Sequence, residues 1–384
     1  MIKAVLLDLD NTLIHNPDMA FARAFLERMN AFFSDELGIQ QAGQAFRRAI
    51  AAMSNVERIG DHANIDLTAQ IMADVGDVRV TDIRDTLDKF YTEVYPTLQN
   101  CIKPVDGASD FIHKLHDEGY AIVIATNPIY SKAAIIQRMA WGNLPLDESI
   151  YAIITHAENM HFSKPDPAYY AEILGRVGVE PDEALMVGDS NKNDIDAASV
   201  VGIHTYKTDA KHFVKFVASF DDFVSTIPVM PLNPKMIDPQ YRGNIGALYG
   251  MLCDVQDHFW QQRPDPDEWS IMQILCHLLD SEENNERPRL EKILREDNPF
   301  IAEQIPPGPD IPVCSDEGWK VAEQLKKSRA ITRHFIAQLD TPDWKRPARH
   351  SIFGLTTLLE MAYFTAQHDR LHLNQLCQTL GRCK

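Results

Sequence analysis

The stretch Leu6–Leu13, "LLDLDNTL", lies close to the start of the chain and decides how the first half folds. The apolar run that begins at Ile2 predicts a buried strand, yet Asp8 and Asp10 bring two carboxylates to the end of that strand. Unpaired charges are costly to bury, so these carboxylates need cations or hydrogen-bond donors beside them. The stretch therefore predicts a strand that ends at a charged functional site.

Short apolar runs recur further along the chain and alternate with segments of helical periodicity, such as "ASDFIHKLHDEG" at 108–119. This alternation predicts βαβ units and an α/β fold with a doubly wound parallel sheet. The strands of such a sheet are buried on both faces and therefore consist of continuous apolar runs. The predicted strands are 3–10, 120–127, 151–156, 184–190 and 202–208.

Four changes of pattern along the chain predict its domains. Residues 1–14 and 100–225 form the α/β core, and the helical pattern of 15–99 is too long for a simple crossover, so we interpret it as an inserted helical cap. Residues 226–240 are predicted to be a linker, and 241–384 an all-α domain of long amphipathic helices without strands. Proline interrupts helices and sheet ladders, so no regular element is expected in the linker. Its prolines are Pro228, Pro231, Pro234 and Pro239.

Composition narrows the classes of partner and the compartment. With 45% hydrophobic and 24% charged residues among 384, the chain is typical of a water-soluble globular protein. A net charge of -18 disfavours nucleic acid and anionic membrane surfaces as partners. Six cysteines without a CxxC pair predict reduced thiols rather than a disulfide framework. We find no secretory leader and no membrane-spanning run, so we expect a cytoplasmic protein.

Polar residues follow four of the predicted strands. In an open parallel sheet, ligands bind where the strands end, so these residues are expected to meet. Carboxylates there are suited to a hard cation such as Mg²⁺, while a hydroxyl, backbone groups and a lysine are suited to phosphoryl oxygens. In chain order the residues are Asp8 and Asp10, Thr126 and Asn127, Lys164 in "HFSKPDP", and Asp189 and Asp194 in "GDSNKND".

In this order and spacing, the four motifs resemble those of the haloacid dehalogenase superfamily, over residues 1–225. The resemblance implies that Asp8 is a nucleophile that forms an aspartyl-phosphate. It also implies that Asp10 protonates the leaving oxygen and then activates the water that hydrolyses the intermediate. The expected phosphate-binding residues are Thr126, Asn127 and Lys164, and the expected Mg²⁺ ligands are Asp8, the backbone carbonyl of Asp10, Asp189 and Asp194.

Reactions within this superfamily can be compared on single residues. Its dehalogenases lack the second carboxylate of the first motif, so Asp10 argues against dehalogenation. Its phosphonate hydrolases use a cap lysine, and Lys89, the only lysine in 15–99, is better explained as a solvated helix residue. We therefore predict hydrolysis of a small phosphorylated metabolite beneath the cap, with a phosphosugar mutase as the alternative. His15 and Asn16 follow the first motif and either contact substrate or belong to a surface loop.

Three histidines stand out in the predicted all-α domain. His368 and His372 are four residues apart and share one apolar helix face, and His277 lies on another amphipathic helix. Such residues are usually hydrogen-bonded core histidines, but two on one stripe favour a metal. Three imidazoles suit Zn²⁺, Ni²⁺ or Fe²⁺ and do not select among them.

The segment that starts with Trp269 and Ser270 and the terminal "LLEMAYFTAQHDRLHLNQL" resemble the DinB-like family, over about 240–380. The resemblance implies an up-down four-helix bundle, often a homodimer, with a divalent transition metal at the three histidines. Some members are metal-dependent thiol transferases, so the alternatives are such an enzyme or a non-catalytic binding or dimerisation module. Asp280 and Asp369 could orient an imidazole or form surface salt bridges.

Overall fold

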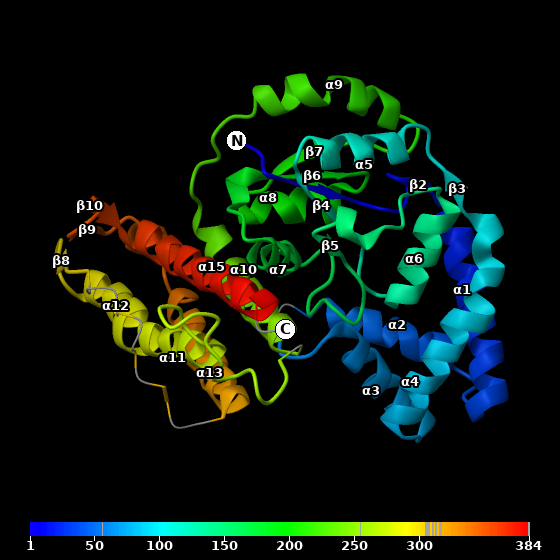
Figure 1. Ribbon diagram of the computed structural model, residues 1–384, viewed down its shortest axis with the longest axis horizontal. Coiled ribbons are helices and arrows are strands. Elements are labelled where there is room, and N and C mark those ends of the chain that lie inside the picture. The colour runs from blue at the N-terminus through cyan, green and yellow to red at the C-terminus, as the bar shows by residue number, and fades with distance from the viewer. Residues whose placement is uncertain are drawn as a thin grey trace. The chain divides into compact units, whose positions relative to one another are not determined.

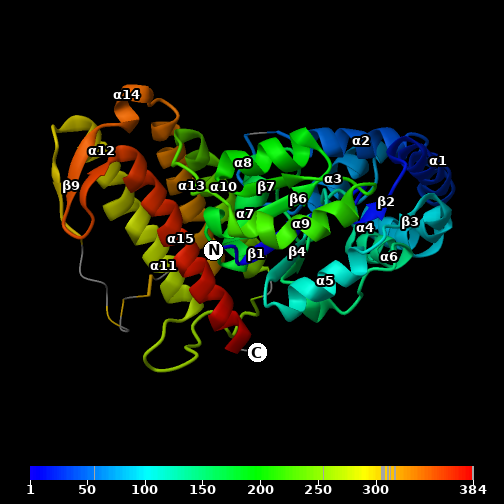
Figure 2. The same cartoon turned by 90° about the horizontal axis from the view of Figure 1, so that it is seen from above.

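The computed structural model describes residues 1–55, 57–253, 255–303, 308, 311, 313–314 and 317–382. Contacts divide the chain into two compact units, of which the first is Met1–Tyr170 with Pro181–Met230 and the second is Ala171–Glu180 with Pro231–Lys384. Figures 1 and 2 show their helices and strands. None of the helices in the described ranges combines the length and apolar character that crossing a bilayer requires.

The first unit is built on a five-stranded sheet in the order β5-β4-β1-β6-β7. Its central strand, β1, runs parallel to both neighbours and pairs Leu7 with Ile124 and Val187. All side chains of β1 are buried, as in a strand covered on both faces. The predicted doubly wound parallel sheet is confirmed. The strands are β1 (Ala4–Leu7), β4 (Ala121–Ile124), β5 (Ile153–Ile154), β6 (Ala184–Gly188) and β7 (His204–Lys207).

Helices cover both faces of this sheet, with α5 and α9 over one face and α8 on the other (Figure 1). The ring of Phe111 on α5 packs edge-on against Phe213 and Phe216 of α9, with centroids 5.8 and 5.4 Å apart. This aromatic contact anchors the last helix of the unit. The helices are α5 (Ala108–Asp117), α6 (Lys132–Trp141), α8 (Ala197–Val201) and α9 (Phe213–Ser225), with short turns η3 (Glu148–Ile150), η4 (Pro181–Glu183) and η5 (Asn191–Asp196). Helix α7 (Pro167–Val177) begins in this unit, and its residues from Ala171 belong to the second.

The insertion after β1 is helical and has its own aromatic core. An antiparallel ribbon of β2 (Ile14–His15) and β3 (Lys103–Pro104) joins its two ends. Inside it, the ring of Phe25 lies 5.2 Å from that of Phe46 and 5.5 Å from that of Phe90. Its elements are α1 (Asp18–Leu37), α2 (Ala42–Met53), α3 (Asn64–Gly76), α4 (Val80–Lys89), η1 (Phe90–Val94) and η2 (Tyr95–Cys101).

The second unit is a bundle of long helices, in which α10 packs against α13 and α15, and α11 packs against α13 and α15. The predicted bundle is confirmed. Its elements are η6 (Pro234–Met236), α10 (Ile237–Leu252), α11 (Ile271–Ser281), η7 (Glu282–Glu286), α12 (Arg287–Arg295), α13 (Gly318–Ile336), α14 (Thr341–Trp344) and α15 (Leu358–Arg382).

Two expectations for this half of the chain are wrong. A three-stranded sheet of β8 (Phe300–Ile301), β9 (Pro347–His350) and β10 (Gly354–Thr357) is present, although no strand was predicted. These strands have only two to four residues each, too few for an alternating pattern to be visible. Pro239 was expected to break regular structure, yet it lies in the first turn of α10, where a missing N–H costs nothing.

The prediction that the thiols are reduced is wrong for one pair. Cys276 of α11 and Cys314 form a disulfide, with their Cα atoms 5.9 Å apart and a sequence separation of 38. The pairing depends on the tertiary fold, so the cysteine spacing gave no sign of it. Cys101, Cys253 and Cys377 are not joined in disulfides among the described residues, and Cys383 lies outside them.

Candidate functional site

The turn after β1 determines where the first two aspartates lie. Asn11 has a φ of 59°, a left-handed conformation that asparagine adopts more readily than most residues. Its Oδ1 accepts a hydrogen bond from the backbone N–H of Asn16 at 3.0 Å. The N–H of Leu13 donates to the carbonyl of Leu9 at 3.0 Å. The chain therefore reverses direction immediately after the buried strand.

Lys164 lies between two of the predicted carboxylates. Its Nζ donates to Asp8 Oδ1 at 2.8 Å and to Asp194 Oδ1 at 2.6 Å, and its side chain is only 1% exposed. Thr12 Oγ1 donates to Asp8 Oδ2 at 3.2 Å. Both oxygens of Asp8 are thus held by protein donors.

Asp194 reaches this cluster because the strand before it ends in glycine. A Cβ atom on Gly188 would lie 2.5 Å from the carboxyl group of Asp194, so a larger residue would displace that group. The backbone N–H of Ser190 donates to Asp194 Oδ2 at 2.9 Å, while Lys164 occupies Oδ1. Since both oxygens of Asp194 have protein partners, this residue positions Lys164.

Burial and the neighbouring charges shift the pKa values of Asp8 and Lys164. It raises the pKa of Asp8 to about 7, although the charge of Lys164 opposes this shift. Burial acts to lower the pKa of Lys164, but the attraction of Asp8 and Asp194 outweighs it and holds that pKa well above its ordinary value. Lys164 is therefore a permanent cation, whereas Asp8 needs further positive charge to be fully ionised at neutral pH.

Three carboxylates at this place are suited to a hard divalent cation. Oxygen atoms of Asp8, Asp189 and Asp194 all lie within 4.8 Å of one another. The single charge of Lys164 balances only part of their negative charge. Mg²⁺ prefers carboxylate oxygens and water, so the residues present fit this ion.

Thr126 and Asn127 leave the sheet at the same edge as Asp8. Parallel strands β1 and β4 are in register up to Leu7 and Ile124, so the segments that follow them emerge together. Thr126 is buried, and the buried Oδ1 of Asn127 has no hydrogen-bond partner in the described part of the chain. The structure places both residues where the sequence predicts them.

Asp10 has different neighbours from Asp8. Its Oδ1 accepts a hydrogen bond from Asn16 Nδ2 at 2.7 Å and pairs with Nη2 of Arg138. Of the two residues left open by the sequence, Asn16 is buried and belongs to the site, whereas His15 is exposed.

Sequence reasoning missed Arg138. This residue belongs to α6 and is 1% exposed, and its guanidinium carbon lies 5.3 Å from the ring centre of Phe21 and 5.4 Å from that of Tyr130. The available signal was an arginine on a helix face that also carries the buried residues Ile135 and Met139. An ionic side chain among apolar neighbours is rare unless it has a partner.

Asn64, at the start of α3, ties the inserted helices to the loops of the site. Its Nδ2 donates to the carbonyl of Pro128 at 3.2 Å and to that of Phe162 at 3.0 Å. Pro128 follows the predicted phosphate-binding pair, and Phe162 precedes Lys164 by two residues. The cap is therefore docked directly onto the segments that carry the predicted ligands of the phosphate.

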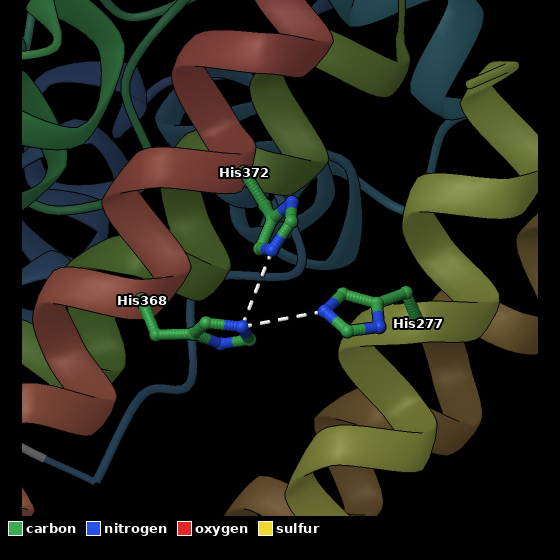
Figure 3. Close-up of side chains that lie close together, drawn as sticks. All are labelled: His277, His368 and His372. Carbon is green, nitrogen blue, oxygen red and sulfur yellow. Dashed lines mark hydrogen bonds between the residues drawn. The ribbon is translucent and has the colours of Figure 1, made fainter. Parts of the chain in front are cut away.

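The three predicted histidines come together in the second unit (Figure 3). His368 Nε2 lies 3.3 Å from His277 Nε2 and 3.2 Å from His372 Nε2. His277 extends from α11, and the other two are one turn apart on α15. Three imidazole nitrogens that meet at one point are suited to a transition metal.

These imidazoles are neutral. Burial lowers the pKa of His277 to about 3 and that of His372 to about 4, and it also lowers the pKa of His368. His372 Nδ1 lies 2.9 Å from Gln375 Oε1, which only accepts hydrogen bonds, so Nδ1 donates and Nε2 presents a lone pair. The ring of Trp269 is stacked on His372, with centroids 5.6 Å apart. Neutral rings are the form that binds metals.

Neither aspartate proposed as an orienting group forms such a contact. Asp369 accepts two hydrogen bonds from Arg329, at 2.5 and 3.0 Å, and a third from Asn244 Nδ2 at 3.1 Å. Asp280 accepts from Asn284 Nδ2 at 2.8 Å. Asp369 thus forms a buried ion pair, and Gln375 is the residue that orients one of the imidazoles.

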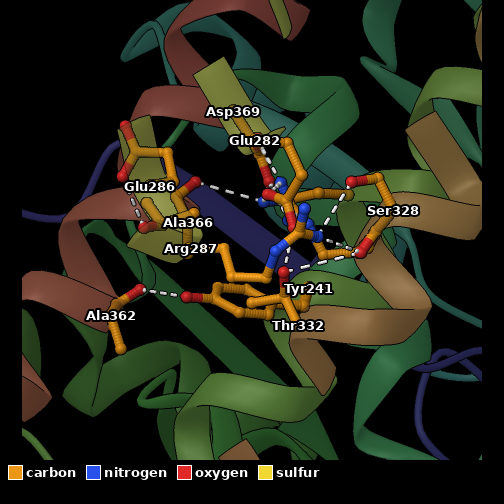
Figure 4. A network of polar contacts seen from close by, with 12 residues as sticks. Tyr241, Glu282, Glu286, Arg287, Ser328, Thr332, Ala362, Ala366 and Asp369 are labelled. Atoms are coloured by element: carbon orange, nitrogen blue, oxygen red, sulfur yellow. Dashed lines mark hydrogen bonds and ion pairs between the residues drawn. The ribbon is translucent and has the colours of Figure 1, made fainter. Parts of the chain in front are cut away.

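A buried polar network occupies the bundle beside this ion pair (Figure 4). Arg329 Nε also donates to Glu282 Oε2, at 3.0 Å. One turn further, Thr365 Oγ1 donates to Glu286 Oε2 at 2.7 Å. Burial raises the pKa of Glu286 to about 7. The network therefore holds both a strongly paired carboxylate and one that titrates near neutral pH.

Two family models match the chain. The haloacid dehalogenase-like hydrolase family matches residues 2–202, and the DinB superfamily matches residues 240–376. Among curated proteins, a phosphoglycolate phosphatase of Rhodospirillum rubrum is 27% identical over 237 residues, which cover 59% of this chain and 89% of that protein. A pyrophosphatase PpaX of Halalkalibacterium halodurans is 25% identical over 204 residues, which cover 53% and 82%.

Similar solved structures exist for each half. A HAD phosphatase from Thermococcus onnurineus is 22% identical, with a TM-score of 0.34, and covers 54% of this chain and 86% of that one. YfiT from Bacillus subtilis, described as a probable metal-dependent hydrolase with an unusual four-helix bundle topology, is 17% identical, with a TM-score of 0.35, and covers 41% and 92%.

Proposed function

Because the chain belongs to the haloacid dehalogenase-like hydrolase family, we propose that it is a phosphatase that hydrolyses a small phosphomonoester through an aspartyl-phosphate. The main support for this proposal is the position of Asp8. It is a buried carboxyl group at the end of the central strand and accepts hydrogen bonds from Lys164 and Thr12. The phosphoglycolate phosphatase and pyrophosphatase named above support this activity. The second half matches the DinB superfamily, so both resemblances inferred from sequence are confirmed.

In the proposed reaction, an oxygen of Asp8 attacks phosphorus, and the bond from phosphorus to the alcohol oxygen breaks. Asp10 gives its proton to that oxygen and later takes a proton from the water that attacks the aspartyl-phosphate. This second step releases inorganic phosphate and restores Asp8. Lys164 balances part of the charge of the phosphoryl oxygens, and Thr126 and Asn127 donate hydrogen bonds to them.

Asp8, Asp189 and Asp194 form the proposed Mg²⁺ site, together with the backbone carbonyl of Asp10. The ion would supply the positive charge that offsets repulsion between Asp8 and the phosphoryl group. Lys164 supplies a fixed charge on the other side of Asp8. A mutase would use the same residues and differ in the acceptor, so release of free phosphate separates the two reactions.

Phosphate release from a panel of small phosphomonoesters tests this proposal. The full-length protein should release inorganic phosphate with Mg²⁺ and lose this activity in a chelator. Rapid quenching during turnover should trap one phosphoryl group per chain, and reduction with borohydride followed by mass spectrometry should assign it to Asp8. Absence of phosphate release from every ester, or a phosphoryl group on another residue, would contradict the mechanism.

We also propose that the second unit binds a divalent transition metal, Zn²⁺, Ni²⁺ or Fe²⁺, through His277, His368 and His372. The supporting observation is the convergence of their Nε2 atoms. Element-resolved analysis of the full-length protein, purified without chelators, should find one such metal per chain. His368→Ala should abolish it, and His334→Ala, a change of an exposed histidine on α13, should not. A metal-free wild-type protein would overturn the proposal. The cytoplasmic location and the homodimer stay predictions.

A further inference from the structure

Arg138 carries two buried nitrogen donors that pair with no group in the described part of the chain. Its Nη2 pairs with Asp10, but Nε and Nη1 have no hydrogen-bond partner among the described residues. The residue is 1% exposed, so bulk water does not take their place. Leaving charged donors unpaired in a buried place is costly, which indicates a partner supplied from outside the chain.

The positive charge of this arginine is only partly compensated. Burial lowers the pKa of Arg138 to about 9, and the charge of Asp8 opposes the shift without cancelling it. The side chain therefore remains a cation at neutral pH. Aromatic rings of Phe21 and Tyr130 pack near the guanidinium carbon and cannot accept the in-plane hydrogen bonds of Nε and Nη1, so these donors are the part of the group left for a ligand.

The contact with Asp10 indicates which part of the substrate these donors face. In the proposed mechanism, Asp10 protonates the leaving oxygen, so groups that touch Asp10 surround the alcohol part of the substrate. Asn16 also contacts Asp10, and its buried Oδ1 has no hydrogen-bond partner among the residues that the structure describes. Lys164 pairs instead with Asp8, the group that attacks phosphorus. The two buried cations thus serve different parts of the substrate.

We propose that Arg138 binds an anionic group on the alcohol part of the phosphomonoester and thereby makes the enzyme select esters that carry a second negative charge. This inference rests on the proposed phosphatase function and adds the substrate class. A carboxylate or a second phosphoryl group presents oxygens that accept charge-assisted hydrogen bonds from the unpaired N–H groups of the guanidinium. Because Phe21 belongs to α1, the cap takes part in holding the arginine.

Three esters of similar size test the proposal: phosphoglycolate, which carries a carboxylate, 1,2-ethanediol bisphosphate, which carries a second phosphoryl group, and uncharged ethyl phosphate. The wild-type enzyme should prefer at least one charged ester over ethyl phosphate in kcat/KM by about 10- to 100-fold, the range for charge-assisted hydrogen bonds. Arg138→Met should remove this preference, chiefly by raising KM for the charged ester. The preferred ester identifies the anionic group.

Two further variants control for structural effects. Arg138→Lys keeps the charge with fewer donors and should retain part of the preference, which covers the case in which Arg138→Met does not fold. Arg84→Met changes an arginine that pairs with Asp66 on the cap and is 44% exposed, so it should leave the preference unchanged.

Two outcomes would overturn the role of Arg138: a wild-type enzyme that hydrolyses ethyl phosphate as efficiently as both charged esters, or an Arg138 variant that keeps the wild-type preference. In either case, phosphate release itself would leave the proposed phosphatase function standing. If none of the esters released phosphate, the phosphatase function and this inference would fail together.

Discussion

The two candidate sites differ in how their buried polar side chains are stabilised. At the edge of the sheet, the carboxyl groups of Asp8 and Asp194 are buried against one shared cation, the ammonium group of Lys164. In the bundle, His277 and His372 are buried as neutral rings, because burial lowers their pKa values to about 3 and 4.

Because of this difference, we expect substitutions at the two sites to change the stability of the protein by different amounts. An ionic cluster depends most on the group that carries its compensating charge, here Lys164, since its removal leaves buried carboxylates without a cation. A cluster of neutral imidazoles loses little when one ring is removed, because no charge is left behind. The first site should therefore couple function to folding, while the second should be alterable almost without cost to stability.

Asp8→Asn should have the largest effect and should act on activity alone. We expect phosphate release to fall by roughly 10⁴-fold, as in other enzymes that lose their nucleophile. Burial raises the pKa of Asp8 to about 7, so a neutral side chain of the same shape should not reduce the thermal unfolding temperature. Steady-state assays and thermal unfolding would measure both effects. A rate within tenfold of wild type would exclude Asp8 as the nucleophile.

Lys164→Met should destabilise the first unit. It leaves Asp8 and Asp194 without their shared cation, so we expect a loss of about 3–5 kcal/mol in urea unfolding with chelator present. Mg²⁺ should restore part of that loss. The control is Lys89→Met, since Lys89 is an exposed cap lysine paired with Glu36 at 3.3 Å, and its change should cost less than about 1 kcal/mol. Equal losses in the two variants would show that the cluster is not held by its charges.

Glu286→Gln tests a carboxyl group of the bundle whose neutral form is favoured by burial, as the neutral form of the histidines is. Burial raises the pKa of Glu286 from 4.5 to about 7, so the folded protein binds this proton more tightly than the unfolded chain. Its contribution to stability is therefore fully present below pH 4.5 and is lost as the pH rises towards 7 and above. Glutamine removes this dependence and keeps an acceptor for Thr365. The variant should be more stable than wild type by about 3 kcal/mol at pH 8 and equal to it near pH 4.

The control is Glu283→Gln, which changes an exposed residue of the same turn and should alter stability little at either pH. Urea unfolding at several pH values would measure all three proteins. If the stability of wild type and of Glu286→Gln changed with pH in the same way, the pKa of Glu286 would not differ between the folded and the unfolded protein.

The sequence alone predicts well which side chains lie at the end of a strand or on one face of a helix. The ends of parallel strands meet at one edge, so the order of strands and polar residues along the chain is enough to group Asp8, Thr126 and Asp189. Helical periodicity in the same way places His368 and His372 on one face. In each case the prediction depends on the geometry of a single strand or helix and on one rule of topology.

Contacts between elements are what the sequence does not reveal. Arg138 belongs to α6 and Asp10 to the turn after β1, and no local pattern joins them. The disulfide of Cys276 with Cys314 is of the same kind. Such pairs depend on how helices pack against strands and loops, so their partners are known only once the whole fold is known.

His368→Ala should have the smallest effect on stability and so gives the sharpest test of the contrast between the two sites. The Nε2 atoms of its neighbours lie 3.2 and 3.3 Å away, and the neutral ring is partly exposed, so water can replace it. In chelator, the unfolding free energy should change by less than about 1 kcal/mol, and phosphate release should equal that of wild type. Without chelator, the variant should lose the stabilisation that a bound metal gives, whereas His334→Ala should keep it. A loss of several kcal/mol in chelator would mean that the three rings support the fold as strongly as the ion pairs of Lys164 do, and the contrast between the sites would not hold.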